Sequence, residues 1–213
     1  MCLTRKSFLP NMPLLAAGLL FSSLAFGGAQ IQSPLSASVR AVLQHSIADQ
    51  ASANSGFSSV QKERIWMRTM SHRMSKYMPD RNTRLDFLKT VHYEAARAGL
   101  DPQMVLGLIE VESRFRKYAV SKAGARGYMQ VMQFWVKDIG TQGQDLFHLR
   151  TNLRYGCTIL RYYLDMEHGN LFRALGRYNG SLGRPGYPLR VKNAWLNHWN
   201  LPHQQDMKTA SAD

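Results

Sequence analysis

The sequence predicts a mainly α-helical domain. Apolar residues recur at intervals of three and four through most of the chain, which is the spacing of one helix face, and no segment alternates as a strand would. Gly99, Gly124, Gly169 and Gly183 fall between the periodic stretches and mark loops. The chain has 213 residues, so one compact domain can bury a substantial core.

The predicted elements follow one another with short connections. Residues 30–58 are rich in Ser, Ala and Gln, and we expect a flexible tether there or a loose helix around 39–47. Residues 60–78 predict a helix with a row of methionines, which at helical spacing fills a core rather than binding a metal, and Pro79 ends it. The remaining predicted helices are 84–98, 102–115, 127–139, 152–168, 171–178 and 189–199. The polar tail 202–213 is expected to be disordered.

The helix predicted over 102–115 carries an acid inside its apolar face. Asp101 and Pro102 form a good helix start, a capping side chain followed by a residue suited to the first turn. Six apolar residues then cover an arc of about 160° around the helix, and Glu112 falls near the middle of that arc. The six are Met104, Val105, Leu108, Ile109, Val111 and Phe115. Glu110 falls on the far side and is expected to be solvated.

Burial removes the water that stabilises a carboxylate. The pKa of Glu112 should therefore rise above its ordinary value of about 4.3, which keeps the acid protonated near neutral pH, as general acid catalysis requires. The alternative is a structural glutamate, either paired with Arg114 or Arg116 or turned to solvent where the helix frays.

Three separated motifs support the catalytic interpretation. Glu112-Ser113 begins the segment ESRFRKYAVSKAGARGYMQVM, whose Gly-Tyr-Met-Gln at 127–130 is followed by Met-Gln at 132–133, and Arg-Tyr-Asn stands at 177–179. Over roughly residues 84–200 the chain resembles the soluble-type lytic transglycosylases, or SLT family, whose pattern is Glu-Ser, Gly-Leu-Met-Gln with Met-Pro, and Ala-Tyr-Asn. Tyr for Leu, Gln for Pro and Arg for Ala are the departures, and none removes the acid, the amide or the tyrosine hydroxyl.

The resemblance implies a lysozyme-like, goose-type-like helical fold with a substrate groove, formed by a catalytic domain at 84–201 after an N-terminal helix and connection at 59–83. It implies a peptidoglycan lytic transglycosylase that cleaves the β-1,4 bond between N-acetylmuramic acid and N-acetylglucosamine. Glu112 would act first as acid and then as base, leaving a 1,6-anhydro end. Most glycosidases use a second carboxylate; here the candidates Asp138, Asp145, Asp165 and Glu167 are better explained as caps or surface charges.

The other motif residues are predicted to bind substrate. Ser113 and Gln130 would hydrogen-bond acetamido or hydroxyl groups, Met132 and Asn179 would line the groove, and Tyr178 would hold the catalytic acid through its hydroxyl. The alternatives are that Tyr178 is a half-buried core tyrosine and that Met132 fills the core.

The N-terminus predicts export. Arg5 and Lys6 precede an apolar run over 14–26, and Gly27 and Ala29 fit a signal-peptidase site, so residues 1–29 are predicted to be a cleavable signal peptide and the protein to be periplasmic. The run is shorter than the roughly 20 residues that span a bilayer, so no stable membrane span is expected after cleavage; the alternative is an uncleaved anchor.

Charge and composition narrow the partners. The formal net charge of +13 becomes +11 without Arg5 and Lys6, the charged residues of the signal segment. A polyanionic partner such as the cell wall fits, as would a membrane surface or nucleic acid, and export argues against nucleic acid; solvated helix faces explain the charge equally well. The expected partner is peptidoglycan, with a transenvelope secretion machine as a further candidate.

No cofactor or metal is predicted, because the seven histidines show no ligand spacing and no phosphate-binding loop is present. Cys2 precedes the apolar run and so does not fit lipidation. Cys157 is expected to be a small buried residue. Two alternatives to the transglycosylase stay open at this point: a lysozyme-type hydrolase, and a non-catalytic wall-binding or secretion-assembly protein on the same scaffold.

Overall fold

The computed structural model describes residues 30–48, 59–141 and 143–201. Those residues form helices and connecting loops, with isolated β-bridges but no strand, so the mainly α-helical prediction is confirmed for them. The elements are α1 (Ala37–Ile47), α2 (Val60–Met74), α3 (Arg81–Arg97), α4 (Pro102–Ser113), α5 (Gln133–Ile139), α6 (Leu149–Met166), α7 (Leu171–Asn179), α8 (Gly186–Ala194) and the π-helical turn η1 (Trp195–Trp199).

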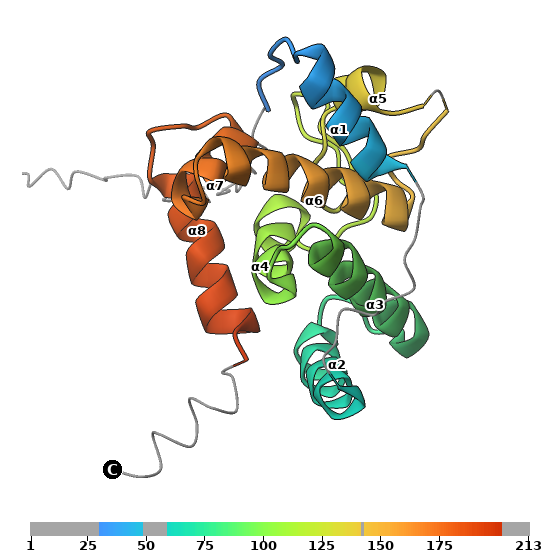
Figure 1. The fold of residues 1–213 in the computed structure, drawn as a ribbon. Helices are drawn as coiled ribbons and strands as arrows, with labels where there is room; N and C mark the ends of the chain where they lie inside the picture. Colours follow the sequence, from blue (N-terminus) through green and yellow to red (C-terminus); the bar gives the residue numbers. More distant parts are fainter. Residues whose placement is uncertain (1–29, 49–58, 142, 202–213) are drawn as a thin grey trace, which may run out of the picture.

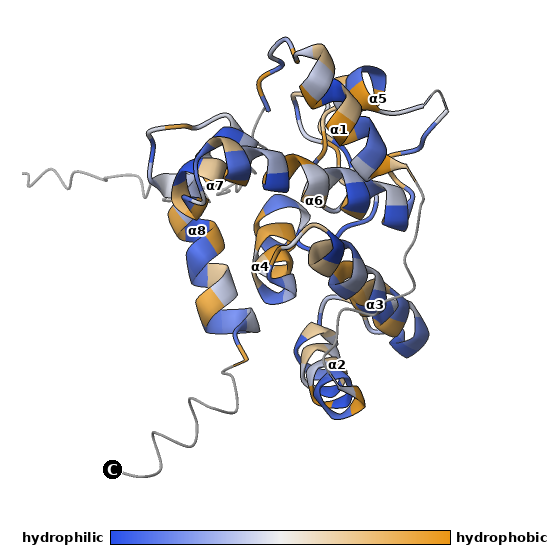
Figure 2. Ribbon diagram, in the orientation of Figure 1, coloured by the Kyte–Doolittle hydropathy of each residue, from blue (hydrophilic) through white to orange (hydrophobic). Residues whose placement is uncertain are grey.

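Helix α4 lies at the centre of the molecule, with α8 along one side and α3 on the other (Figure 1). Asp101 caps its start as predicted, accepting hydrogen bonds from the backbone N–H groups of Gln103 (2.6 Å) and Met104 (3.4 Å). The helix is buried over its first two turns, where Figure 2 shows it strongly hydrophobic. It ends at Ser113 rather than at Phe115, because Arg114 and Phe115 both adopt left-handed backbone conformations (φ 52° and 62°) that no α-helix continues.

A buried carboxylate fastens α3 to α6. Glu94 on α3 is completely buried and accepts hydrogen bonds from Arg154 on α6 (2.9 Å) and from Arg97 (3.1 Å) and Arg150 (3.4 Å). A buried charge is tolerated when it is paired in this way. The pairing orients α6, which in turn contacts α7.

The helix predicted over 127–139 begins only at Gln133. Residues 120–131 form instead a loop with two isolated bridges, Val120 to Arg126 and Arg126 to Val131. Gly127 and Gln130 have positive φ values of 75° and 49°, which a right-handed helix cannot contain. The prediction of helix through this motif was therefore wrong, and the motif is a tight turn.

The N-terminal segment packs onto the domain. Of the two expectations for this region, tether or helix, the structure has a helix at 37–47, with Leu43 and Ile47 in the core and contacts to α5 and α6. The predicted signal peptide and the C-terminal tail lie outside the described residues. Over the part of the chain that is described, no helix has both the length and the hydrophobicity that a bilayer crossing requires. Cys157 is buried and forms no disulfide, as expected.

Candidate active site

Glu112 lies in the last turn of α4, partly buried, with one strong hydrogen-bond donor. The Tyr187 hydroxyl donates to its Oε1 at 2.5 Å. Burial raises the pKa of Glu112 to about 7, against the opposing effects of the Tyr187 hydrogen bond and the positive charge of Arg190. The predicted rise of the pKa is confirmed, and the group is half protonated near neutral pH. Such a carboxyl can both donate and accept a proton at that pH.

Tyr187, which donates to Glu112, and Arg190, which supplies the positive charge, lie one turn apart on α8. Tyr187 is 3% exposed, and the Arg190 guanidinium carbon lies 5.8 Å from the centre of its ring. A glycine sets how closely α8 and η1 approach α4: a Cβ on Gly107 would lie 2.7 Å from the backbone nitrogen of Trp195. The absence of a side chain at this position therefore allows the close contact that brings Tyr187 to the acid.

The predicted bond between Tyr178 and Glu112 was wrong. Tyr178 is buried at 1% exposure, and its hydroxyl donates to the carbonyl oxygen of Met129 at 2.7 Å. Glu112 is close enough to raise the pKa of Tyr178, although burial is the larger cause. Tyr178 thus stands beside the site and holds the Gly-Tyr-Met-Gln turn, while Tyr187 holds the acid. The alternative interpretation as a half-buried core tyrosine is right about the core position of the ring but wrong about its exposure, because the side chain is fully buried.

Glu110 is not the solvated residue that the helical projection predicted. Its carboxylate accepts hydrogen bonds from the Tyr77 hydroxyl (2.8 Å) and the Trp199 indole N–H (2.6 Å), and His198 Nδ1 lies 3.0 Å away. Its side chain is 14% exposed. The reason is that η1 and the segment after α2 that carries Tyr77 cover this side of α4, which the period of a single helix cannot reveal.

One asparagine organises the turn that carries the second motif. Asn152 on α6 is fully buried; its Oδ1 accepts from the Met129 N–H at 2.8 Å, and its Nδ2 donates to the carbonyls of Arg126 and Leu146, both at 2.9 Å. A Cβ on residue 127 would lie 2.5 Å from that Nδ2, which is too close for any real side chain. Glycine at this position therefore lets the backbone of the turn come close to Asn152.

The other residues predicted to bind substrate make different contacts in the structure. The Gln130 amide nitrogen donates to the carbonyls of Ala119 (3.1 Å) and Gly127 (2.9 Å), so its donors serve the turn itself. The Ser113 hydroxyl donates to the carbonyl of Ile109 within α4. Met132 caps α5 and is partly buried, and Asn179 ends α7 with an unpartnered, buried Nδ2. Their roles toward substrate stay predictions.

A residue from the N-terminal segment also reaches this region. Gln30 is 4% exposed, its Oε1 accepts from the Met132 N–H at 3.3 Å, and its side chain lies against the Tyr178 hydroxyl. Sequence reasoning considered Gln30 only as the expected first residue after signal cleavage.

No second carboxylate acts on Glu112 among the described residues. The four candidates weighed from the sequence are engaged elsewhere: Asp138 accepts from Gln32 (3.1 Å), Asp145 from the Phe147 N–H (2.8 Å), Asp165 from Arg161, and Glu167 from Arg173 and Arg177. Within the described ranges, no three His, Cys, Asp or Glu side chains gather as a metal site would need.

Tyr187, Asn152 and Gln30 were missed from the sequence. For Tyr187 a signal existed: Tyr187 and Arg190 at a spacing of three share one helix face. The predicted helix began at 189 and so left the tyrosine outside. Asn152 and Gln30 act across long sequence separations and leave no local pattern.

The described surface is also hollowed on either side of α1. Cavities of about 560 Å³ and 490 Å³ lie between α1 and, respectively, the α3–α6 surface and the α5–α6 connection. Neither is lined by any residue predicted from the sequence to bind substrate or to catalyse.

Comparison with known proteins places residues 89–194 under the family model "Transglycosylase SLT domain". A transglycosylase of Enterobacteria phage PRD1 is 28% identical over 109 residues, covering 51% of this chain and 40% of that protein. Membrane-bound lytic murein transglycosylase C of Yersinia pestis (strain Pestoides F) is 39% identical over 113 residues, covering 46% and 32%. The same enzyme of Actinobacillus pleuropneumoniae serotype 5b (strain L20) is 44% identical over 61 residues, covering 29% and 15%.

Among solved structures, an inactive mutant of the lytic transglycosylase Slt from Pseudomonas aeruginosa is similar with a TM-score of 0.41 and 16% identity. That match covers 86% of this chain and 36% of the other. The chain spans 15 to 40% of the length of the three curated relatives described above.

Proposed function

The chain belongs to the soluble-type lytic transglycosylases and carries their SLT domain, and from this premise we propose that it cleaves the β-1,4 bond between N-acetylmuramic acid and N-acetylglucosamine in peptidoglycan, leaving a 1,6-anhydro-muramoyl end. Glu112 is the catalytic residue, first as acid and then as base. The observation that carries the proposal is the partly buried carboxyl of Glu112, with a pKa of about 7 and a 2.5 Å bond from Tyr187.

In the first half of the reaction, Glu112 gives its proton to the glycosidic oxygen, and the bond from that oxygen to C1 of the muramoyl residue breaks. Positive charge develops at C1, where the sugar's own acetamido group can assist. The new Glu112 carboxylate keeps the Tyr187 hydrogen bond, and Arg190 contributes favourable charge. Both effects stabilise the anion that the step creates.

In the second half, the Glu112 carboxylate takes the proton of the C6 hydroxyl while that oxygen bonds to C1. Every proton is returned, and no water is consumed. One carboxyl performing both steps agrees with the lack of a second acidic partner around Glu112 in the described part of the chain. A pKa of about 7 suits this double use, because neither protonation state is strongly disfavoured near neutral pH.

The same proposal places the protein in the periplasm, where its substrate lies. Arg5, Lys6 and the apolar run over 14–26 support export. N-terminal sequencing of protein recovered from the periplasm of a Gram-negative host is expected to begin near Gln30. An intact Met1 on membrane-bound protein would contradict cleavage.

Mass spectrometry of purified cell wall digested by the enzyme tests the reaction. The expected muropeptides are lighter by one water than the products of hydrolysis. Products at the hydrated mass would instead identify a lysozyme-type hydrolase, and a wall that releases no fragments would identify a non-catalytic wall-binding or assembly protein.

A further inference from the structure

The loop between α4 and α5 is strongly and uniformly basic. Between Ser113 and Lys137 the sequence contains no Asp or Glu. The cations of the loop are Arg114, Arg116, Lys117, Lys122 and Arg126. This loop begins after Ser113, the last residue of the helix that carries Glu112, and it includes the turn at 127–130 that the Tyr178 hydroxyl holds.

Two aromatic rings and two of these cations form one surface cluster, the 118–147 platform, defined as Lys117, Tyr118, Arg126 and Phe147. The Tyr118 and Phe147 ring centres are 5.6 Å apart at an angle of 55°. Lys117 Nζ lies 5.1 Å from the centre of the Tyr118 ring, and the Arg126 guanidinium carbon lies 5.7 Å from that of Phe147. Tyr118 is 70% exposed, so a large aromatic face is open to solvent beside two positive charges.

The platform cations lack acidic partners in the part of the chain that the structure describes. No described carboxylate lies within ion-pair distance of Lys117 or Arg126, whereas other basic residues of the molecule do have such partners, as in the pairs of Arg97 with Glu94 and Arg173 with Glu167. Guanidinium and ammonium groups held over aromatic rings keep their donors free for an incoming anion.

The loop that carries Lys117, Tyr118 and Arg126 of the platform is held by hydrogen bonds within itself. The Gly127 N–H donates to the carbonyl of Ala119 (2.9 Å), and the Ser121 N–H donates to that of Ala125 (3.0 Å). The Ser121 hydroxyl accepts from the Ala125 N–H (3.0 Å), and the Gln130 side chain donates to Ala119. A loop tied at these points loses little conformational entropy on binding.

We propose that the 118–147 platform binds the peptide stem attached to the muramoyl residue, with Lys117 and Arg126 holding its carboxylates and Tyr118 and Phe147 contacting its apolar groups. This inference rests on the proposed function and names the substrate class within it: glycan strands that carry peptide stems with free carboxylates. Free carboxylates are the partners that unpaired cations favour, and in intact wall the stems carry them because the lactyl carboxyl of each muramoyl residue is bound in the amide link to its stem.

Binding by the Glu112→Gln variant tests the site without cleavage. Two preparations of the same purified wall serve as ligands, one native and one with its stem carboxyls converted to amides. Co-sedimentation is expected to show roughly three- to tenfold weaker binding to the amidated wall, the loss that follows from removing two exposed ion pairs. Equal binding to both preparations would overturn the proposal.

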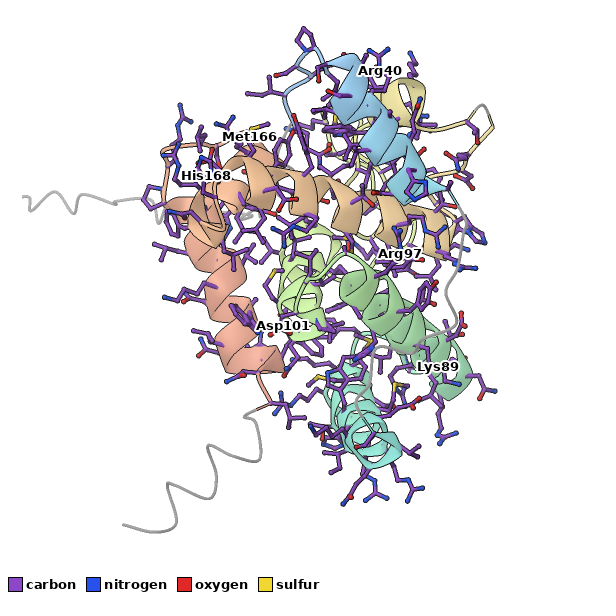
Figure 3. All side chains as sticks on the ribbon, viewed as in Figure 1. Arg40, Lys89, Arg97, Asp101, Met166 and His168 are labelled. Carbon is purple, nitrogen blue, oxygen red and sulfur yellow. The ribbon has the colours of Figure 1, made fainter. Side chains whose placement is uncertain are left out.

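Substitutions locate the effect. Lys117→Gln with Arg126→Gln, in the same Glu112→Gln background, is expected to weaken binding to native wall by a similar factor and to leave binding to amidated wall unchanged. The matched control is Arg40→Gln with Lys89→Gln, which removes the same charge from α1 and α3 at the edges of the molecule (Figure 3). An equal loss in the control would show that net charge alone acts, and would overturn the site.

Tyr118→Ala separates stacking from charge. Because Tyr118 is 70% exposed, the variant is expected to keep its melting temperature and to bind both preparations more weakly. Unchanged binding would exclude the aromatic part of the platform. Anhydro products from the wild-type enzyme, with equal binding to both walls, would refute this site alone. Selective binding without anhydro products would refute the proposed function alone.

Discussion

Glu110 and Glu112 lie two residues apart on one helix and are used in different ways. Glu110 accepts hydrogen bonds from Tyr77 and Trp199, and His198 Nδ1 lies 3.0 Å from both of its carboxylate oxygens. Glu112 receives one donor, from Tyr187, and its pKa rises to about 7 because burial outweighs that bond. The two carboxylates therefore differ in their surroundings: several protein groups hold Glu110 in place, whereas burial beside a single donor raises the pKa of Glu112.

The largest expected difference between the two glutamates is in catalysis. Glu112→Gln keeps the shape and the acceptor for Tyr187 but cannot donate a proton, so turnover of purified wall should fall by about 10³-fold or more. Glu110→Gln should stay within about tenfold of wild type when assayed well below its melting temperature, because the residue acts through packing. Comparable losses in the two variants would contradict the assignment of the acid.

The second prediction contrasts the two tyrosines beside the acid. Tyr187→Phe removes the bond that stabilises the Glu112 carboxylate, so the rate should fall by roughly ten- to a hundredfold.

The pH profile distinguishes the two tyrosines further. The first step needs the protonated form of Glu112, so kcat/KM of the wild type should decline as pH rises through about 7. Without Tyr187 the pKa of Glu112 rises further, and this alkaline limb should move to higher pH. Tyr178→Phe is the matched control, and its limb should not move. If the alkaline limb moved in Tyr178→Phe and not in Tyr187→Phe, Tyr178 rather than Tyr187 would be the hydrogen-bond partner of Glu112.

For the free energy of unfolding, in contrast to catalysis, we expect a substantial loss from substitution of Glu110. Glu110→Gln replaces one of two acceptor oxygens with a donor that faces other donors, and we expect a loss of about 2–4 kcal/mol in the free energy of unfolding. Denaturant titration at neutral pH measures it. The surface variant Glu63→Gln on α2 provides the control and should change stability by less than about 0.5 kcal/mol. A loss no greater than that of the control would show that the network around Glu110 contributes nothing.

The smallest expected effect is the pH dependence of the stability of Glu112→Gln. The folded state holds the Glu112 proton up to about pH 7, whereas the unfolded state releases it near the ordinary value of 4.5, so wild-type stability falls between these values as pH rises. The variant escapes this loss. It should match the wild type below pH 4.5 and exceed it by about 1–3 kcal/mol above pH 7. A difference that does not change with pH would contradict the raised pKa.

Capping residues and helical spacing in the sequence predicted the features that depend only on neighbouring residues in the chain. The start of α4 at Asp101 and Pro102 and the apolar surroundings of Glu112 follow from one helix and its neighbouring residues, and both agree with the structure. The length and the helical spacing of α6 and α7 also came close to the observed bounds. The motif at 127–130 was mistaken for helix because its apolar content resembled one, while positive φ at Gly127 and Gln130 made it a turn.

Long-range packing accounts for what the sequence could not predict. Glu110 is covered by residues more than 80 positions later in the chain, and its helical position alone indicated solvent. The donor to Glu112 comes from α8, which reaches α4 only because Gly107 leaves room for Trp195. The third motif led us to predict a bond from Tyr178 to Glu112, but the Tyr178 hydroxyl donates to Met129, a partner that depends on how α7 packs against the turn at 127–130.

Met129 has both of its backbone polar groups tied to side chains from different helices: its N–H to Asn152 on α6 and its carbonyl to Tyr178 on α7. Sliding of α7 along α6 is therefore expected to move the two peptide units on either side of the Met129 Cα relative to each other. The position of the Gly-Tyr-Met-Gln turn at 127–130 thus depends on how α6 and α7 are placed relative to each other. A substitution that shifts either helix is expected to act on this turn even when it lies far from it in the sequence.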